Sequence, residues 1–98
     1  MNISKNQEGS TLNIALEGRL DTTASPLLEE ELDANLDGIT DLVFDFDALE
    51  YVSSAGLRVL LSAQKRMNRQ GKMTITNAKP LIMEIFDITG FTDILNIE

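Results

Sequence analysis

One segment constrains the fold more than any other, because a strand-like run of residues passes within a few positions into a helix-like run. Residues 42–46 are rich in β-branched and aromatic side chains, which fit a pleated and mostly buried strand. The apolar residues of the second run recur at the spacing of one helical face: Leu57, Leu60, Leu61, Ala63 and Met67. Ser53 and Ser54 stand between the runs, where a serine oxygen can accept a hydrogen bond from an unpaired first-turn amide. The segment therefore predicts a buried strand joined directly to an amphipathic helix over residues 54–70.

Gly56 lies in the first turn of that expected helix, where a glycine costs about 1 kcal/mol relative to alanine. It follows Ser53, Ser54 and Ala55, so four small residues stand in a row at the helix N-terminus. Small side chains leave this end open to another surface, and the positive end of the helix dipole favours a phosphate group there. We interpret residues 53–56 as a docking and modification point, with Gly56 present for a close approach rather than for a kink.

The preceding part of the chain predicts two strands and a helix. Residues 12–16 show the apolar alternation of a half-buried strand, and a turn at residues 8–10 would pair it antiparallel with residues around Ile3. A helix with a leucine at every fourth position follows, and Pro26 fits its first turn. Its candidate caps are Thr22, Thr23 and Ser25.

The following part predicts another strand and helix. Gly71 is expected to cap the central helix, residues 73–76 to form a strand, and residues 80–89 to form a helix that Gly90 ends. The apolar tail over residues 91–97 is expected to pack back as a short strand or turn. The order β-β-α-β-α-β-α predicts an α/β fold: a mixed, partly parallel sheet of four to five strands with helices packed on it.

Composition narrows the class of protein. With 98 residues the chain is expected to be a single domain, residues 1–98, that buries about 60–65% of its unfolded surface. The lack of cysteine excludes disulfides and thiolate metal sites. A net charge of −8 argues against nucleic-acid binding and favours a basic protein partner. No apolar run is long enough to insert into a membrane and the first residues are not a signal peptide, so a cytoplasmic location is expected.

Several kinds of chemistry are excluded or disfavoured. Without histidine the chain cannot form a Ser–His–Asp triad, although Ser54 to Gly56 echo the second half of a nucleophile elbow. The sequence contains neither a P-loop nor a Gly-x-Gly-x-x-Gly loop. Asp45 and Asp47 could share one face at a strand end and hold Mg²⁺, but solvated carboxylates at a strand terminus are the preferred interpretation. We therefore predict no catalysis, no metal site and no cofactor.

Two motifs resemble a known family. Residues 51–61, centred on the Ser54-Ala55-Gly56 stretch, closely resemble the signature of bacterial anti-sigma factor antagonists, which are single STAS domains. Residues 16–21 resemble the second hallmark of that family, the loop that leaves the second strand. The Lys79-Pro80 turn into a late helix is also similar, so the resemblance covers nearly the whole chain. It implies a STAS-type fold.

The resemblance also implies a function by partner switching. Such an antagonist binds an anti-sigma factor that is also a serine kinase, which frees the sigma factor. The kinase then phosphorylates a serine that corresponds to Ser54, the antagonist is released, and a phosphoserine phosphatase resets it. The implied partner contacts are Asp21, Thr22, Ser53, Ser54, Ala55, Gly56 and Arg58. Many members of the family have an aspartate where this chain has Ser53, which makes Ser53 a competing acceptor.

Other interpretations stay open at this point. Ser54 could be an unmodified helix cap, with Ser53 a turn residue, and Asp21 could cap the first helix as well as contact the kinase. A second functional hypothesis is a structural STAS subunit of a membrane lipid ABC transporter, without a phosphoserine switch. A third is a nucleotide-binding STAS module, which no glycine loop supports. Nothing in the sequence demands more than a monomer.

Overall fold

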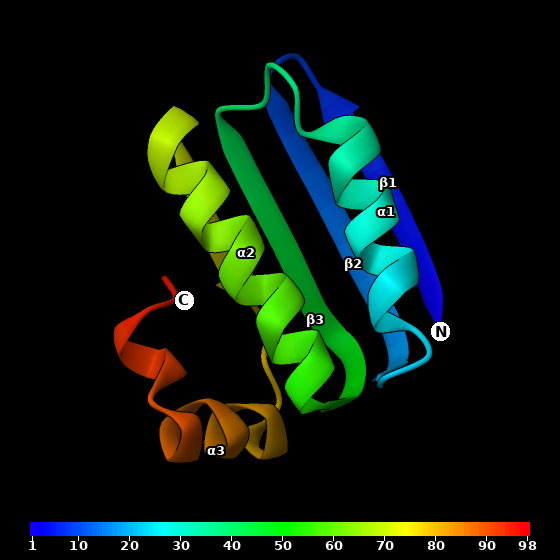
Figure 1. Cartoon of the computed structure of the whole chain (residues 1–98), viewed down its shortest axis with the longest axis vertical. Coiled ribbons are helices and arrows are strands. Elements are labelled where there is room, and N and C mark those ends of the chain that lie inside the picture. The colour runs from blue at the N-terminus through cyan, green and yellow to red at the C-terminus, as the bar shows by residue number, and fades with distance from the viewer.

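A single four-stranded sheet in the order β1-β2-β3-β4 organises the computed structural model, which describes residues 1–98 (Figure 1). The strands are β1 (Asn2–Glu8), β2 (Thr11–Leu20), β3 (Asp41–Val52) and β4 (Lys72–Thr76). β1 pairs antiparallel with β2, whereas β2, β3 and β4 are parallel. The helices are α1 (Ser25–Asn35), α2 (Ser54–Gln70), α3 (Pro80–Thr89) and the 3₁₀ turn η1 (Phe91–Asp93). The element order and the mixed sheet expected from the sequence are confirmed.

Alternation along β2 produces the expected half-buried strand. Leu12, Ile14 and Leu16 are each about 1% exposed and face the helices, while the residues between them are half-buried on the other face. The hairpin to β1 turns at Gly9, whose φ of +60° lies in the left-handed region that glycine adopts without strain. The hairpin expected at residues 8–10 is therefore confirmed.

β3 is longer than the strand expected over residues 42–46. Its register against β2 shifts twice, and each shift accommodates one extra residue on β3. Gly18 pairs with Leu49 but Arg19 with Tyr51, and earlier, at a bulge, Ala15 pairs with Asp45 but Glu17 with Ala48. This bulge breaks the apolar alternation that the sequence prediction followed. After it the strand continues to Val52 and delivers the chain directly to α2.

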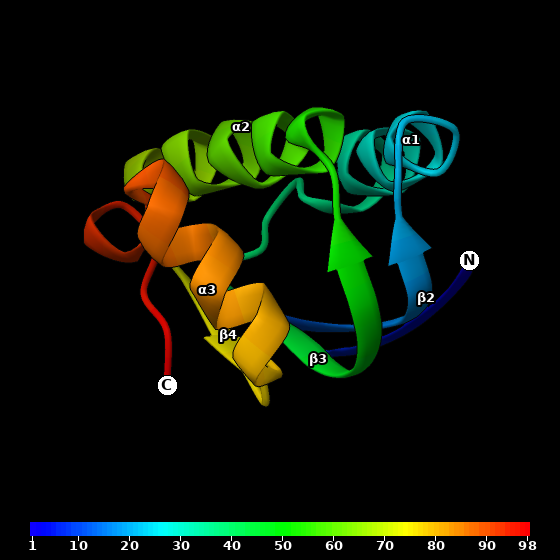
Figure 2. The same cartoon turned by 90° about the horizontal axis from the view of Figure 1, so that it is seen from below.

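α1 and α2 lie side by side over one face of the sheet (Figure 2). α3 packs beyond them, where its Phe86 ring lies 6.5 Å from that of Phe46. The opposite face of β1, β2 and β3 is polar and only shallowly hollowed, with Asn13 and Asp45 half-buried on it. Parallel sheets usually have both faces covered. Here the expected helices cover only one face of the sheet, so the domain has two layers.

The ends of the helices follow local chemistry. Gly71 caps α2 as expected, but its φ of 171° is extended and not left-handed. The site requires glycine because a Cβ atom would lie 1.9 Å from the Thr40 carbonyl oxygen. Gly90, with φ of 79°, ends α3 as expected, and the tail reaches β4 through a single parallel bridge between Ile75 and Ile97. No helix of the structure is long and apolar enough to span a membrane.

Candidate functional site

The loops that leave β2 and β3 meet at one edge of the sheet. Leu20 and Val52 are paired in the parallel register, so both strands end at the same level. The Ser53 amide then donates to the Leu20 carbonyl oxygen at 2.9 Å and ties the two loops together. The two segments that the sequence analysis selected, residues 16–21 and 51–61, are therefore brought together by the fold.

Ser53 is the N-cap of α2. Its backbone is extended, its Oγ accepts a hydrogen bond from the Gly56 amide at 3.2 Å, and its residue is only 9% exposed. The Ser53 carbonyl oxygen also accepts the first helical hydrogen bond, from the Leu57 amide at 2.9 Å. The alternative in which Ser54 is an unmodified cap and Ser53 a turn residue is wrong, because the extended, capping residue at the junction is Ser53.

Ser54 is the first residue of α2 and is exposed. Ser53 provides the cap, and the Ser54 hydroxyl forms no hydrogen bond within the protein. Its own amide and that of Ala55 belong to the first turn, where helical N–H groups have no partner inside the helix. A free hydroxyl thus stands at the positive end of a 17-residue helix.

Gly56 is buried, and the residue that approaches it closely is Leu20 of the same chain, not a partner protein. A Cβ atom at this position would lie 2.8 Å from both the Cγ atom and the carbonyl oxygen of Leu20. The expected close approach is present, but it lets α2 pack onto the end of β2 and does not leave Gly56 open to a partner. Leu20 was not singled out from the sequence, because an apolar residue at a strand end has no distinguishing pattern.

Asp21 organises the start of α1. Its Oδ1 accepts a hydrogen bond from the Ala24 amide at 2.8 Å, and its carbonyl oxygen accepts from the Ser25 amide and hydroxyl at 2.9 and 2.6 Å. The candidate caps Thr22, Thr23 and Ser25 do not accept from the helix, since its N-cap is Ala24 without a side-chain bond. Asp21 therefore stabilises the turn that precedes α1, and the alternative in which Asp21 is the N-cap of α1 is wrong, because the N-cap is Ala24.

An open groove separates the N-terminal ends of α1 and α2. Thr22 and Ser25 line its α1 side, and Ala55 and Arg58 line its α2 side. Thr22 and Arg58 are exposed and Ala55 is half-buried. Of the expected contact residues, the fold thus gathers Asp21, Thr22, Ser54, Ala55 and Arg58 around one edge, while Ser53 and Gly56 are buried beneath them.

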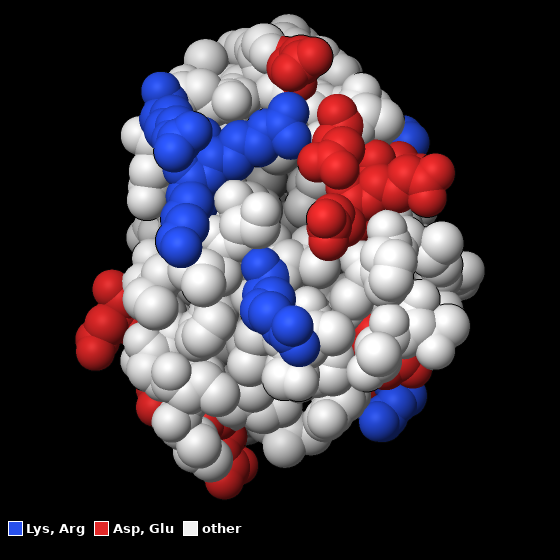
Figure 3. All heavy atoms as spheres, viewed as in Figure 1, with Lys and Arg blue, Asp and Glu red and all other residues white.

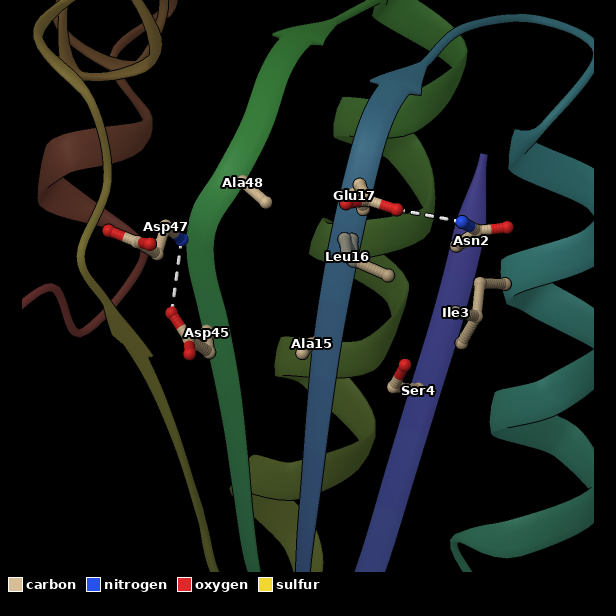
Figure 4. Close-up of a pocket in the computed structure, with 9 residues that line it drawn as sticks. All are labelled: Asn2, Ile3, Ser4, Ala15, Leu16, Glu17, Asp45, Asp47 and Ala48. Atoms are coloured by element: carbon tan, nitrogen blue, oxygen red, sulfur yellow. Dashed lines mark hydrogen bonds between the residues drawn. The ribbon is translucent and has the colours of Figure 1, made fainter.

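A second hollow lies at the edge of the uncovered sheet face (Figure 4). Its polar groups are occupied by one another: Asn2 donates to Glu17 at 2.7 Å, and the Asp45 carboxylate accepts from the Asp47 amide at 3.0 Å. Asn77 also donates to Asp45 at 3.1 Å. The Asp45 carboxylate thus holds the β3 bulge in place, and no group of three candidate metal ligands is formed.

The comparisons with known proteins agree with this geometry. Residues 2–98 match the STAS domain family, so the chain belongs to that family of STAS domains. It is 35% identical over 96 residues to BtrV of Bordetella bronchiseptica, a protein assigned to the anti-sigma factor antagonists, and the match covers 96% of this chain and 83% of BtrV. It is 28% identical to the anti-sigma-B factor antagonist of Bacillus subtilis, over 99% of this chain and 90% of that protein.

The fold is shared with a solved antagonist. The unphosphorylated anti-sigma factor antagonist SpoIIAA superimposes with a TM-score of 0.86 at 18% identity, over 99% of this chain and 88% of that chain. The phosphorylated form of Bacillus SpoIIAA superimposes with a TM-score of 0.78, again at 18% identity, over 99% of this chain and 91% of that one. The STAS-type fold implied by the sequence motifs is therefore confirmed.

Proposed function

We propose that this chain is an anti-sigma factor antagonist that binds an anti-sigma factor with serine kinase activity and is released when Ser54 is phosphorylated. The observation that carries the proposal is the exposed, unbonded hydroxyl of Ser54 beside a separate capping serine. The names of the relatives supply the class of partner. A cycle that consumes ATP and governs a sigma factor belongs in the cytoplasm.

The chain acts as the substrate in this cycle, and the kinase supplies the catalysis. The Ser54 Oγ attacks the γ-phosphorus of ATP, its proton passes to a base on the kinase, and ADP leaves. A phosphoserine phosphatase then transfers the phosphoryl group to water, which restores the hydroxyl and yields inorganic phosphate. Ser53 is a poor acceptor, because its Oγ is engaged by the Gly56 amide and its side chain is buried.

The expected effect on binding follows from charge. A phosphate group adds about −1.5 to −2 charges at pH 7. The free domain tolerates it, because a helix N-terminus stabilises an anion. In a tight complex the phosphate group has to lose its bound water. It is also repelled by the Asp21 carboxylate on the neighbouring loop, which has the same sign of charge. A hundredfold loss of affinity requires only about 2.8 kcal/mol.

The test is phosphorylation in vitro by the cognate anti-sigma factor kinase with ATP, followed by mass spectrometric mapping of the site. We expect one phosphate on Ser54, none in Ser54→Ala, and continued phosphorylation of Ser54 in the matched variant Ser53→Ala. Ser54→Asp should weaken binding to the kinase. An unmodified Ser54, or undiminished binding by Ser54→Asp, would contradict the proposal.

The transporter-subunit hypothesis predicts a different partner. Co-purification with permease and ATPase subunits, together with phosphate-independent binding, would support that hypothesis instead. A gene for a kinase-type ATPase beside the gene of this chain would favour the antagonist. Neighbouring permease genes would favour the transporter.

A further inference from the structure

The charge of α2 is opposite to that of the whole chain. The chain has a net charge of −8 and contains 16 aspartate and glutamate residues, yet none of them lies in α2. The helix carries half of the eight lysine and arginine residues: Arg58, Lys65, Arg66 and Arg69. The basic protein partner suggested by net charge does not account for this helix.

The positive side chains lie on one exposed face of α2. Ser54, Arg58, Ser62, Lys65 and Arg69 are all exposed and recur at intervals of three or four residues, as neighbours on a helix surface do. We call this row the cationic strip. Figure 3 shows basic side chains along α2 on the outer face of the helical layer, beside acidic side chains over α1. The opposite face of α2 is buried on the sheet.

The charges of the strip have no partner within the molecule. Arg66, beside the strip, pairs with Asp33 at 3.2 Å and Asp37 at 3.5 Å. Arg58, Lys65 and Arg69 form no ion pair. The negative end of the helix dipole stabilises Arg69 in the last turn, but Arg58 lies near the positive end, where a cation gains nothing from the dipole. The stability of the helix therefore does not explain why a positively charged residue, Arg58, stands near its N-terminus.

The acidic face of α1 restricts what the strip can bind. Glu29, Glu30 and Asp33 are exposed on the neighbouring helix, and Glu29 faces the same groove as Arg58. A uniformly negative surface, such as a nucleic acid or an anionic bilayer, would meet these carboxylates as soon as it reached the strip. A protein surface can place acidic residues against α2 and neutral or basic residues against α1, so that the potentials are complementary.

Building on the function proposed above, we infer that the cationic strip is a docking surface for an acidic surface of the anti-sigma factor. Ser54 begins the strip, and Arg58 follows one helical turn later. Phosphate on Ser54 neutralises this end of the strip and faces the acidic residues of the partner directly. The switch therefore acts through charge reversal at the start of the docking surface, in addition to steric crowding.

The experiment measures binding of the purified cognate anti-sigma factor to the whole chain by calorimetry over a series of salt concentrations. Arg58→Glu should weaken binding about tenfold or more, because it places like charges together. Lys65→Glu and Arg69→Glu should weaken it in the same direction. The matched control is Lys79→Glu, which makes the same charge change at an exposed lysine outside α2 and should leave the affinity unchanged. Binding of the unmodified chain should weaken as salt rises.

The outcomes separate this inference from the proposed function. If the unmodified chain binds and Ser54 phosphorylation releases it, but all three strip variants bind normally, the docking surface is refuted and the function stands. If the unmodified chain does not bind an anti-sigma factor, both are refuted. Strip-dependent binding to phosphatidylglycerol vesicles or to RNA in place of the protein would also refute the inference. Circular dichroism should show that each variant folds, since every substituted side chain is exposed.

Discussion

Replacing Gly56 by alanine tests whether close packing or helix propensity decides the stability of this edge. Propensity alone predicts that Gly56→Ala stabilises the domain by about 1 kcal/mol, because alanine is favoured over glycine within a helix. The structure predicts the opposite sign. The new Cβ atom would lie 2.8 Å from the Leu20 carbonyl oxygen and 2.8 and 3.0 Å from the Leu20 Cγ and Cδ2 atoms.

The carbonyl contact is the harder of these to relieve. A flexible side chain can turn aside, but the Leu20 carbonyl oxygen accepts from the Ser53 amide at 2.9 Å and cannot retreat without stretching that bond. Overpacking of this kind costs about 1–3 kcal/mol, and a weakened hydrogen bond costs about 1 kcal/mol more. After subtracting the gain of about 1 kcal/mol in helix propensity, we expect a net loss of about 1–3 kcal/mol.

The assay is urea unfolding, supported by thermal melting, in which 1 kcal/mol corresponds to about 4–8 °C for a domain of this size. Leu20→Ala removes the Cγ and Cδ2 atoms but keeps the carbonyl, so a double-mutant cycle separates the two contacts. In the Leu20→Ala background the Gly56→Ala substitution should cost less but should still destabilise. A Gly56→Ala variant as stable as the unmodified chain would refute the reasoning, because α2 could then retreat from β2 without cost.

Three further predictions concern stability. Ser53→Ala removes the α2 cap and should destabilise by about 1 kcal/mol, whereas Ser54→Ala at the exposed neighbour should change stability by less than about 0.5 kcal/mol, both measured by urea unfolding. Phe86→Ala leaves a cavity in the core and should cost about 3–5 kcal/mol, visible as a lower urea midpoint. Gly71→Ala forces a Cβ atom to within 1.9 Å of the Thr40 carbonyl oxygen, and its melting temperature should fall further than that of Gly56→Ala.

The order of elements was predictable because apolar periodicity is a property of the sequence. The predicted helix over residues 54–70 and the hairpin at residues 8–10 agree with the structure, since each has both a periodic pattern and a terminating signal. The second half of β3 was not predictable. Asp47 and Ala48 are exposed in the bulge, so alternation fails there although pairing with β2 resumes afterwards.

The candidate site was predictable as a segment but not as an arrangement of atoms. Two adjacent serines have the same capping chemistry, and only the backbone decides between them: Ser53 is extended with φ of −83° and ψ of 172°, whereas Ser54 is helical. The neighbour of Gly56 is Leu20, more than thirty residues earlier, and that contact depends on the parallel register of two strands. Local sequence carries no signal for either fact.

The different environments of the two serines support the proposed switch, because a change at Ser54 leaves the cap of α2 intact. The Ser53 side chain is buried and accepts from the Gly56 amide, whereas the Ser54 hydroxyl is exposed and unbonded, as the substrate of a kinase has to be. A phosphate on Ser53 would have to be accommodated at a buried position, whereas a phosphate on Ser54 would not. Serine and aspartate cap helices about equally well. Ser53 therefore caps α2 without placing a negative charge at its positive end, as an aspartate there would do.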